Sequence, residues 1–244
     1  MRVVSQTLGL FLSITLFYYV SRLVSPGAFA SSDAYFAYVV VGIIILAVLT
    51  ATLTALPLTV RQELVAGTFE RFVVSPMGAV AGVAAMILFP LFMALSMAVV
   101  ELLLAALVFG LDIHWSTASL GLPVGLLCAL SFAPFALFMA ASVILVKQVS
   151  GGVTFVTTGL AFVGGFFFPV RLLPDWIEWT SQVQPFTPSL DLLRHLLVDT
   201  PLVDPAWESI LKVALFAAGL LPLSGLALKH AVEACRRRGT LIEY

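Results

Sequence analysis

The sequence predicts an all-α, polytopic membrane protein. Of its 244 residues, 61% are hydrophobic and only 10% are charged, whereas an ordinary soluble domain has about 25% charged residues. Several long runs contain no Asp, Glu, Lys, Arg or His. A helix needs about 20 apolar residues to cross the hydrocarbon core, and most of these runs reach that length. These runs do not alternate between apolar and polar residues, which favours helices over a β-barrel. The composition excludes a disordered chain and argues strongly against a soluble globular domain.

We predict a single transmembrane domain over residues 1–244 with six membrane-spanning helices. The spans are expected near residues 3–24, 35–57, 78–109, 119–146, 149–168 and 208–230. The boundary between the fourth and fifth spans is marked only by the short polar and small stretch from Lys147 to Gly152. The apolar sequence around it is nevertheless too long for one crossing at about 1.5 Å per residue, so we expect a tight reversal there.

The distribution of Lys and Arg predicts the orientation in the membrane. With the N-terminus inside, eight of these residues lie on the cytoplasmic side: Arg2, Arg61, Arg71, Lys147, Lys229, Arg236, Arg237 and Arg238. Four lie outside: Arg22, Arg171, Arg194 and Lys212. We therefore expect a multi-pass protein of the cell membrane (inner or plasma membrane) with both termini in the cytoplasm.

A polar segment between the second and third predicted spans has the pattern of a short amphipathic helix over residues 60–75. Val60, Leu64 and Phe72 fall on one helical stripe, while the charged residues fall on other faces. Such a helix lies at the membrane surface. Two interpretations remain open from the pattern alone: a connecting helix, or a helix that docks a cytoplasmic partner through its charges.

A second polar segment precedes the last predicted span. Two short helices are expected within residues 173–198, with Pro174 and Pro188 at first helical positions and Thr187 as a cap. Trp176 suits the membrane interface. We therefore expect a re-entrant pair of helices that dips back toward the bilayer, either as an interfacial anchor or as a gate over an exit path.

Three motifs in these regions resemble those of a known family. The first is Arg61-Gln-Glu-Leu-Val-Ala-Gly-Thr-Phe-Glu-Arg71, followed by Ser75-Pro76. The others are Gly164-Gly-Phe-Phe-Phe-Pro169 with Leu173-Pro-Asp-Trp176, and Pro185-Phe-Thr-Pro-Ser-Leu-Asp-Leu-Leu-Arg194. Together with the six-span layout, they resemble the permeases of the type-2 ABC exporter family over nearly the whole chain. Those permeases are the transmembrane subunits of ATP-binding-cassette exporters.

The resemblance implies roles for particular residues. The first motif would be a coupling helix, which seats in a groove of a separate ATPase subunit, through Arg61, Glu63, Gly67, Thr68, Glu70 and Arg71. The outer helices would lie over the exit of a central pathway, with the matching positions Pro169, Pro174, Trp176, Pro188, Asp191 and Arg194. Members of the family work as two permeases with two ATPases. We therefore expect cytoplasmic ATP-binding-cassette subunits and a second permease chain, identical or different, as partners in the lipid bilayer.

The sequence itself contains no nucleotide-binding motif. A P-loop needs Gly-Lys before Ser or Thr, whereas the three lysines follow Val146, Leu211 and Leu228. ATP and Mg would therefore bind in the partner ATPase, and we expect no cofactor, metal or catalytic residue in this chain. The 12 basic residues do not exceed the 13 acidic ones, so nucleic acid is not an expected partner.

Glu101 is the only acid deep inside an apolar run. An acid in a span is a functional-site hypothesis by default, and three roles stay open: outer-interface anchoring, a pair with a base such as Arg22, or contact with substrate or protons. The alternative function, an ion-gradient-driven secondary transporter or channel, would need several ionisable residues at mid-membrane. A non-transporting assembly factor or scaffold is a third class. The sequence does not identify the substrate.

Overall fold

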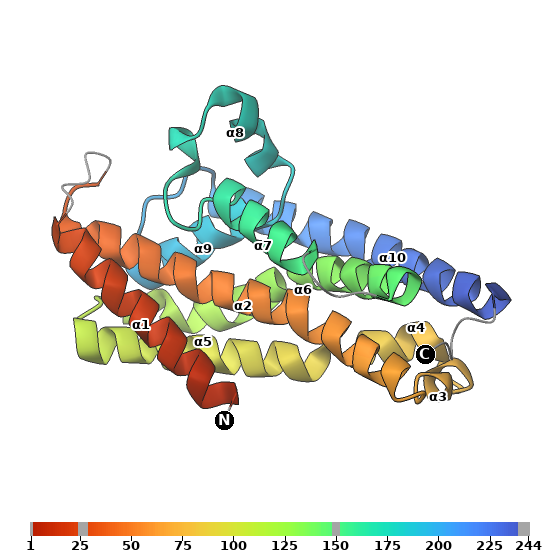
Figure 1. Cartoon of the computed structure of the whole chain (residues 1–244). Helices are drawn as coiled ribbons and strands as arrows, with labels where there is room; N and C mark the ends of the chain where they lie inside the picture. Colours follow the sequence, from red (N-terminus) through yellow and green to blue (C-terminus); the bar gives the residue numbers. More distant parts are fainter. Residues whose placement is uncertain (1, 24–28, 148–151, 239–244) are drawn as a thin grey trace.

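The computed structural model describes residues 2–23, 29–147 and 152–238, and every regular element in these ranges is a helix. Figure 1 shows an elongated bundle in which the long helices run side by side. The helices are α1 (Arg2–Leu23), α2 (Ser32–Val65), α3 (Glu70–Val73), α4 (Gly78–Ala85), α5 (Leu88–Phe109), α6 (Trp115–Val146), α7 (Gly152–Val163), the 3-10 helix η1 (Val170–Leu172), α8 (Asp175–Gln182), α9 (Phe186–Val198) and α10 (Ala206–Arg238). The all-helical prediction is confirmed.

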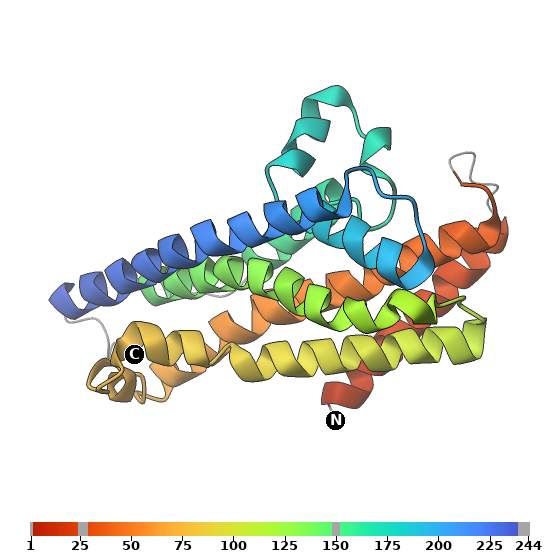
Figure 2. The ribbon, with the colours of Figure 1, turned by 180° about the vertical axis from the view of Figure 1, so that it is seen from behind.

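The two ends of the bundle carry different segments (Figures 1 and 2). At one end, which we call the α3 end, the last turns of α2, α6 and α10 lie near α3 and α4. Toward the other, which we call the α9 end, lie the start of α2, the connection from α5 to α6, and α9. The two polar segments noted in the sequence therefore lie toward opposite ends of the molecule.

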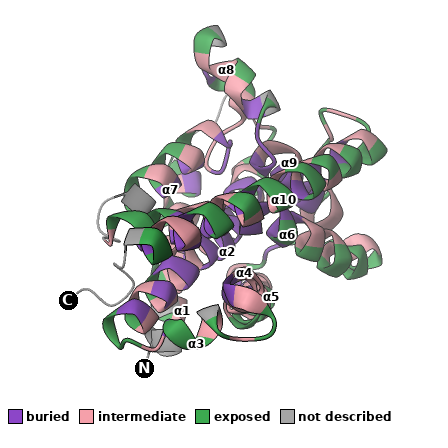
Figure 3. Cartoon of the chain, turned by 90° about the vertical axis from the view of Figure 1, so that its right-hand side faces the viewer, coloured by how far each residue is buried: buried purple, intermediate pink, exposed green. Residues whose placement is uncertain are grey.

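The centre of the bundle is formed by α2 and α6. In the most apolar stretches of these helices 67% and 61% of the residues are buried, against 22% for α4 with α5 and 17% for α10. Figure 3 shows the same division, with buried residues concentrated on α2 and α6. The outer helices expose large apolar side chains such as Phe92, Leu107 and Leu215. Extensive apolar surface of this kind marks contact with a membrane or a partner protein.

In the part of the chain that the structure describes, four helical stretches are long and apolar enough to cross a membrane: Ser32–Val65, Gly78–Phe109 (α4 with α5), Trp115–Val146 and Ala206–Arg237. Two shorter apolar helices, Thr7–Leu23 and Thr154–Val163, belong to α1 and α7. The number of six spans therefore stays a prediction. Residue 24 of the first predicted span and residues 149–151 of the fifth, with part of the expected reversal, lie outside the described residues.

The second, fourth and sixth helices are longer than predicted. α2 has 34 residues rather than 35–57 alone, α6 begins at Trp115 rather than near 119, and α10 has 33 residues rather than 208–230 alone. At about 1.5 Å per residue these helices are roughly 50 Å long, beyond the about 30 Å of a hydrocarbon core. Polar residues at their ends can therefore remain helical outside the core, which the apolar runs did not indicate.

The third predicted span, 78–109, is divided into α4 and α5. Pro90 lies in the first turn of α5. A proline ring clashes with the carbonyl of the residue four positions earlier, which here is Met86. Met86 and Ile87 accordingly separate the two helices.

The prediction of one amphipathic helix over 60–75 is wrong. α2 continues through Pro57 as far as Val65, and a separate turn, α3, begins at Glu70. Between them Gly67 adopts a φ of 67°, a conformation that glycine reaches at no steric cost and that ends helices. Phe69 is buried beneath this break, so the apolar periodicity runs on across a point where the helix stops.

Two helices, α8 and α9, occupy the segment 173–198, but their starts differ from the prediction. α9 begins at Phe186, so Thr187 lies within its first turn and Pro188 is its third residue. Pro174 precedes α8 instead of opening it. Both prolines are tolerated because the first N–H groups of a helix have no partner within it.

The fifth predicted span ends early, because α7 stops at Val163 and the chain turns at Gly165, with φ 77°. This turn crosses α2 at Gly42. A Cβ atom at position 42 would lie 1.9 Å from the carbonyl oxygen of Phe166. The hydrogen side chain of Gly42 is therefore what allows the turn to lie directly on the central helix.

Gly42→Ala tests this close approach. The added methyl group must displace a backbone carbonyl, so we expect a loss of about 1–3 kcal/mol in stability and a lower unfolding temperature of the purified protein in detergent. Gly219→Ala in α10 is the matched control, because a Cβ there meets no atom within 4 Å. Equal unfolding temperatures for the two variants would contradict the packing described.

Candidate functional site

The residues that the resemblance singled out form two groups. One group lies at the α3 end, around the break between α2 and α3, and comprises Arg61, Glu63, Gly67, Thr68, Glu70 and Arg71. The other lies toward the α9 end, from η1 to α9, and comprises Pro169, Pro174, Trp176, Pro188, Asp191 and Arg194. We call residues 61–71 the α3-end segment.

Glu63 fixes the shape of the α3-end segment. Its carbonyl oxygen accepts hydrogen bonds from the N–H groups of Thr68 (3.0 Å) and Phe69 (3.2 Å), and its carboxylate accepts one from the Thr68 hydroxyl. Arg71 lies 3.9 Å from the same carboxylate and donates to the Thr68 carbonyl at 3.5 Å. Three of the predicted residues thus form one contact group that holds the chain after the end of α2.

Arg61 connects the α3-end segment to α6. Its guanidinium donates to the carbonyl oxygen of Lys147, the residue that caps α6 with φ 59°. Carbonyls at a helix C-terminus lack partners within the helix and carry partial negative charge, so a cation is favoured there. Arg61 therefore joins the last turns of the two central helices.

Gly67 and Glu70 are exposed. Gly67 stands where α2 has ended, and Glu70 opens α3. The structure thus divides the predicted group into residues that shape the segment and residues that remain on its surface.

At the other group, the side chain of Arg194 is buried, with 1% exposed, and contacts three parts of the chain. Nε donates to the carbonyl oxygen of Tyr38 at 3.1 Å, and Nη2 donates to the carbonyl oxygens of Gly165 and Phe166 at 3.0 and 2.9 Å. The guanidinium carbon lies 3.4 Å from the centroid of the Tyr38 ring, a cation–π contact. We call Arg194, Tyr38, Gly42, Gly165 and Phe166 the Arg194 site.

The contacts to Gly165 and Phe166 satisfy backbone carbonyls that the fold leaves without helix partners. Gly165 and Phe166 follow the end of α7, where carbonyls are unpaired. The Tyr38 hydroxyl adds a second donor to Gly165 at 3.2 Å. A buried charge is costly unless it is hydrogen-bonded, so the carbonyls and Arg194 stabilise one another.

Asp191, one turn before Arg194 on α9 and outside the four long apolar helices, supplies a nearby opposite charge. Burial raises the pKa of the Asp191 carboxyl, and the positive charge of Arg194 opposes that rise. The opposite charges of Asp191 and Arg194 therefore stabilise one another within α9.

The other predicted outer residues do not join the Arg194 site. Pro169 and Pro174 flank η1, and Pro188 lies in the first turn of α9. Trp176 on α8 is 75% exposed, and α8 stands out from the bundle (Figure 1). An exposed tryptophan suits the membrane interface.

Tyr38 and Gly42 were not predicted as site residues. The sequence contains a signal for each of them. Gly42 is an isolated glycine within the otherwise apolar run Val39–Ile45, and the hydroxyl-bearing Tyr38 directly precedes that run. An isolated glycine in a helical pattern indicates a close approach of another backbone. The sequence does not indicate which backbone approaches.

Glu101 is 3% exposed on α5 and has no hydrogen bond or ion pair with any described residue. The pairing with Arg22 that the sequence left open is absent. Arg22 instead contacts Asp33 at 2.8 Å, because it closes α1 where Asp33 opens α2. Within the described residues, no group of three or more His, Cys, Asp or Glu side chains could hold a metal ion.

Comparison with known families matches residues 1–198 to the family described as ABC-2 type transporter. The chain belongs to this family. The match ends with the last residue of α9 and so contains both groups of candidate residues. Membership and the long apolar helices indicate a multi-pass membrane protein that contains the membrane domain of an ABC-2 type transporter.

One relative is Nodulation protein J of Rhizobium meliloti (strain 1021). It is 30% identical over 90 residues, which are 37% of this chain and 34% of the relative. The chain thus matches about a third of the relative's length.

Arg194→Lys tests the Arg194 site. A lysine ammonium cannot reproduce the planar fork of donors, so we expect a loss of about 2 kcal/mol and a fall of several degrees in unfolding temperature. The control is Arg22→Lys, in an exposed pair with Asp33 that contributes about 1 kcal/mol or less. If thermal unfolding in detergent shifts no more for position 194 than for position 22, the buried contacts are not stabilising.

Proposed function

We propose that this chain is the transmembrane permease subunit of an ATP-driven exporter. Two permease chains, identical or different, form the substrate pathway. Two separate ATPase subunits bind ATP and Mg and drive the transport of substrate through that pathway. The single observation that carries the proposal is membership of the ABC-2 type transporter family over residues 1–198. In this proposal ATP binds outside the sequence given, which contains no Gly-Lys-Ser/Thr motif.

In this proposal the α3-end segment is the contact for the ATPase. It is a compact turn held by Glu63 and Thr68 rather than a long helix. Arg61 ties it to α6. A movement of the ATPase against this segment therefore displaces the ends of α2 and α6 together. The excess of Lys and Arg at this end supports a cytoplasmic location, with both termini inside.

The segment with α8 and α9 lies on the outer side in this orientation. The exposed Trp176 supports an interfacial position for α8. α9 is packed among α2, α6 and α10, which supports a re-entrant helix that returns toward the bilayer. We propose that this pair lies over the exit of the pathway.

Purification from native membranes in mild detergent tests the proposal. We expect a stoichiometric soluble subunit with a P-loop to co-purify and the eluate to hydrolyse ATP. A second membrane chain in the eluate would indicate a heterodimer. An intact permease that never retains an ATPase would instead favour the gradient-driven carrier.

Substitutions in the α3-end segment separate surface contact from internal shape. Glu70→Ala removes an exposed carboxylate, so we expect coupling, measured as transport per ATP hydrolysed, to fall by roughly fivefold or more while the unfolding temperature is unchanged. Glu63→Ala removes the partner of Thr68 and Arg71. We therefore expect both coupling and stability to fall.

The control is Glu233→Ala, in α10 at the same end, where the carboxylate lies 3.9 Å from Lys229. It should leave both coupling and stability unchanged. Normal transport in the Glu63→Ala, Glu70→Ala double variant, present in the membrane at normal level, would show that this segment does not transmit the motion.

A further inference from the structure

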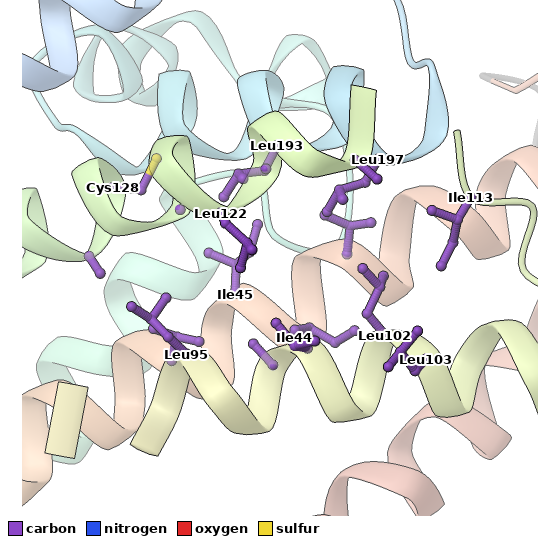
Figure 4. A pocket seen from close by; sticks show the side chains of 18 of the residues that line it. Ile44, Ile45, Leu95, Leu102, Leu103, Ile113, Leu122, Cys128, Leu193 and Leu197 are labelled. Carbon is purple, nitrogen blue, oxygen red and sulfur yellow. The ribbon is translucent and has the colours of Figure 1, made fainter. Parts of the chain in front are cut away.

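A cavity of about 420 Å³ lies between α2, α5, α6 and α9. Figure 4 shows side chains from these four helices converging on one space, among them Ile45, Leu102, Leu122 and Leu193. Protein interiors are close-packed and leave few voids larger than a water molecule. This volume lies instead within the about 300–1,000 Å³ that is typical of ligand pockets.

The side chains that line the cavity favour an apolar ligand. Apart from the Ser119 hydroxyl and the Cys128 thiol, the side chains that face the cavity are hydrocarbon, aromatic or glycine. A buried water needs two to four polar partners, and no charged residue is among those that line the space. Neither water nor a polar solute is suited to it.

The mouth of the cavity opens on the side of the bundle. Val99 and Leu103 of α5 and Leu122 of α6 are exposed lining residues. Ile45 of α2 and Cys128 of α6 are buried lining residues at its back. Because α5 and α6 both belong to helices long enough to cross a membrane, the opening between them faces hydrocarbon rather than water.

We propose that this cavity binds one acyl chain of a bilayer phospholipid. The chain enters between α5 and α6, and the headgroup stays near Trp115, an exposed lining residue at the first position of α6. Tryptophan at such a position suits the level of lipid headgroups. The inference needs only that these helices cross a bilayer, and it does not depend on ATP or on a partner subunit.

An acyl chain in this place contacts α9 from a second side. Leu193 and Leu197 of α9 line the cavity, while the neighbouring Arg194 holds α9 to α2 and to the turn after α7. A bound chain fills the space beneath α9 and restricts its movement toward α5. The lipid is thus a structural ligand of the outer segment.

Photolabelling of the whole protein in vesicles tests the proposal. The probe is a phosphatidylcholine with a diazirine near the end of one acyl chain, and labelled residues are mapped by mass spectrometry after irradiation. We expect label on Ile45 and Cys128, which are buried and line the cavity, and none on Leu49 and Leu53, which are buried on α2 but do not line it. Bulk lipid cannot reach any of these four side chains directly.

A pair of variants provides the control. Val99 lines the cavity and Val100 does not, yet the two are neighbours of the same type with 39% and 44% exposure. Val99→Trp should lower labelling of Ile45 and Cys128 by about tenfold, because one large side chain fills the mouth, and Val100→Trp should leave it unchanged. Label confined to exposed residues such as Leu107, or equal labelling in the two variants, would overturn the proposal.

Discussion

The guanidinium of Arg194 holds together three parts of the chain that are far apart in the sequence. It donates to carbonyl oxygens on α2 and on the turn after α7 while belonging to α9. Irregular backbone at membrane depth is tolerated only where its polar groups have protein or water partners. The early end of α7 is therefore possible because Arg194 supplies the donors that helical N–H groups no longer supply. The lack of a side chain at Gly42 keeps the distance short enough for this.

The rest of the α9 end of the molecule is arranged around that contact. α9 lies beside α2, α6 and α10, with its buried arginine on one side and leucines on another. One side is fixed by charge-assisted hydrogen bonds, which are strong and directional. The other faces an apolar cavity, where contact is weak and depends on filling of space. The hydrogen bonds of Arg194 therefore constrain the position of α9 more strongly than the contacts on its cavity side.

The sequence predicts the helices well and their ends less well. Apolar runs identify the long helices because the hydrocarbon core imposes both length and composition. They do not reveal where α2 stops, since the helix extends past the core and Phe69 continues the apolar period after the break at Gly67. Nor do they show that Pro90 interrupts the third span, because a proline near a helix start and a proline inside a span look alike in an apolar run. The candidate residues follow the same rule. Motif resemblance identifies Glu63 together with its local partners Thr68 and Arg71. It also identifies Arg194, but not the carbonyl partners of Arg194 on α2 and after α7, which tertiary contacts decide.

One consequence follows from the continuity of α2. This helix carries Arg61 and Glu63 at one end and Tyr38 and Gly42 near the other, with no break between them. At about 1.5 Å per residue it is a rod of roughly 50 Å. A tilt of about one degree at the α3 end displaces the far end by about 1 Å, a distance comparable with the difference between a made and a broken hydrogen bond. A small movement at the α3 end of α2 is therefore enough to change the hydrogen bonds of Tyr38 near the other end of the helix.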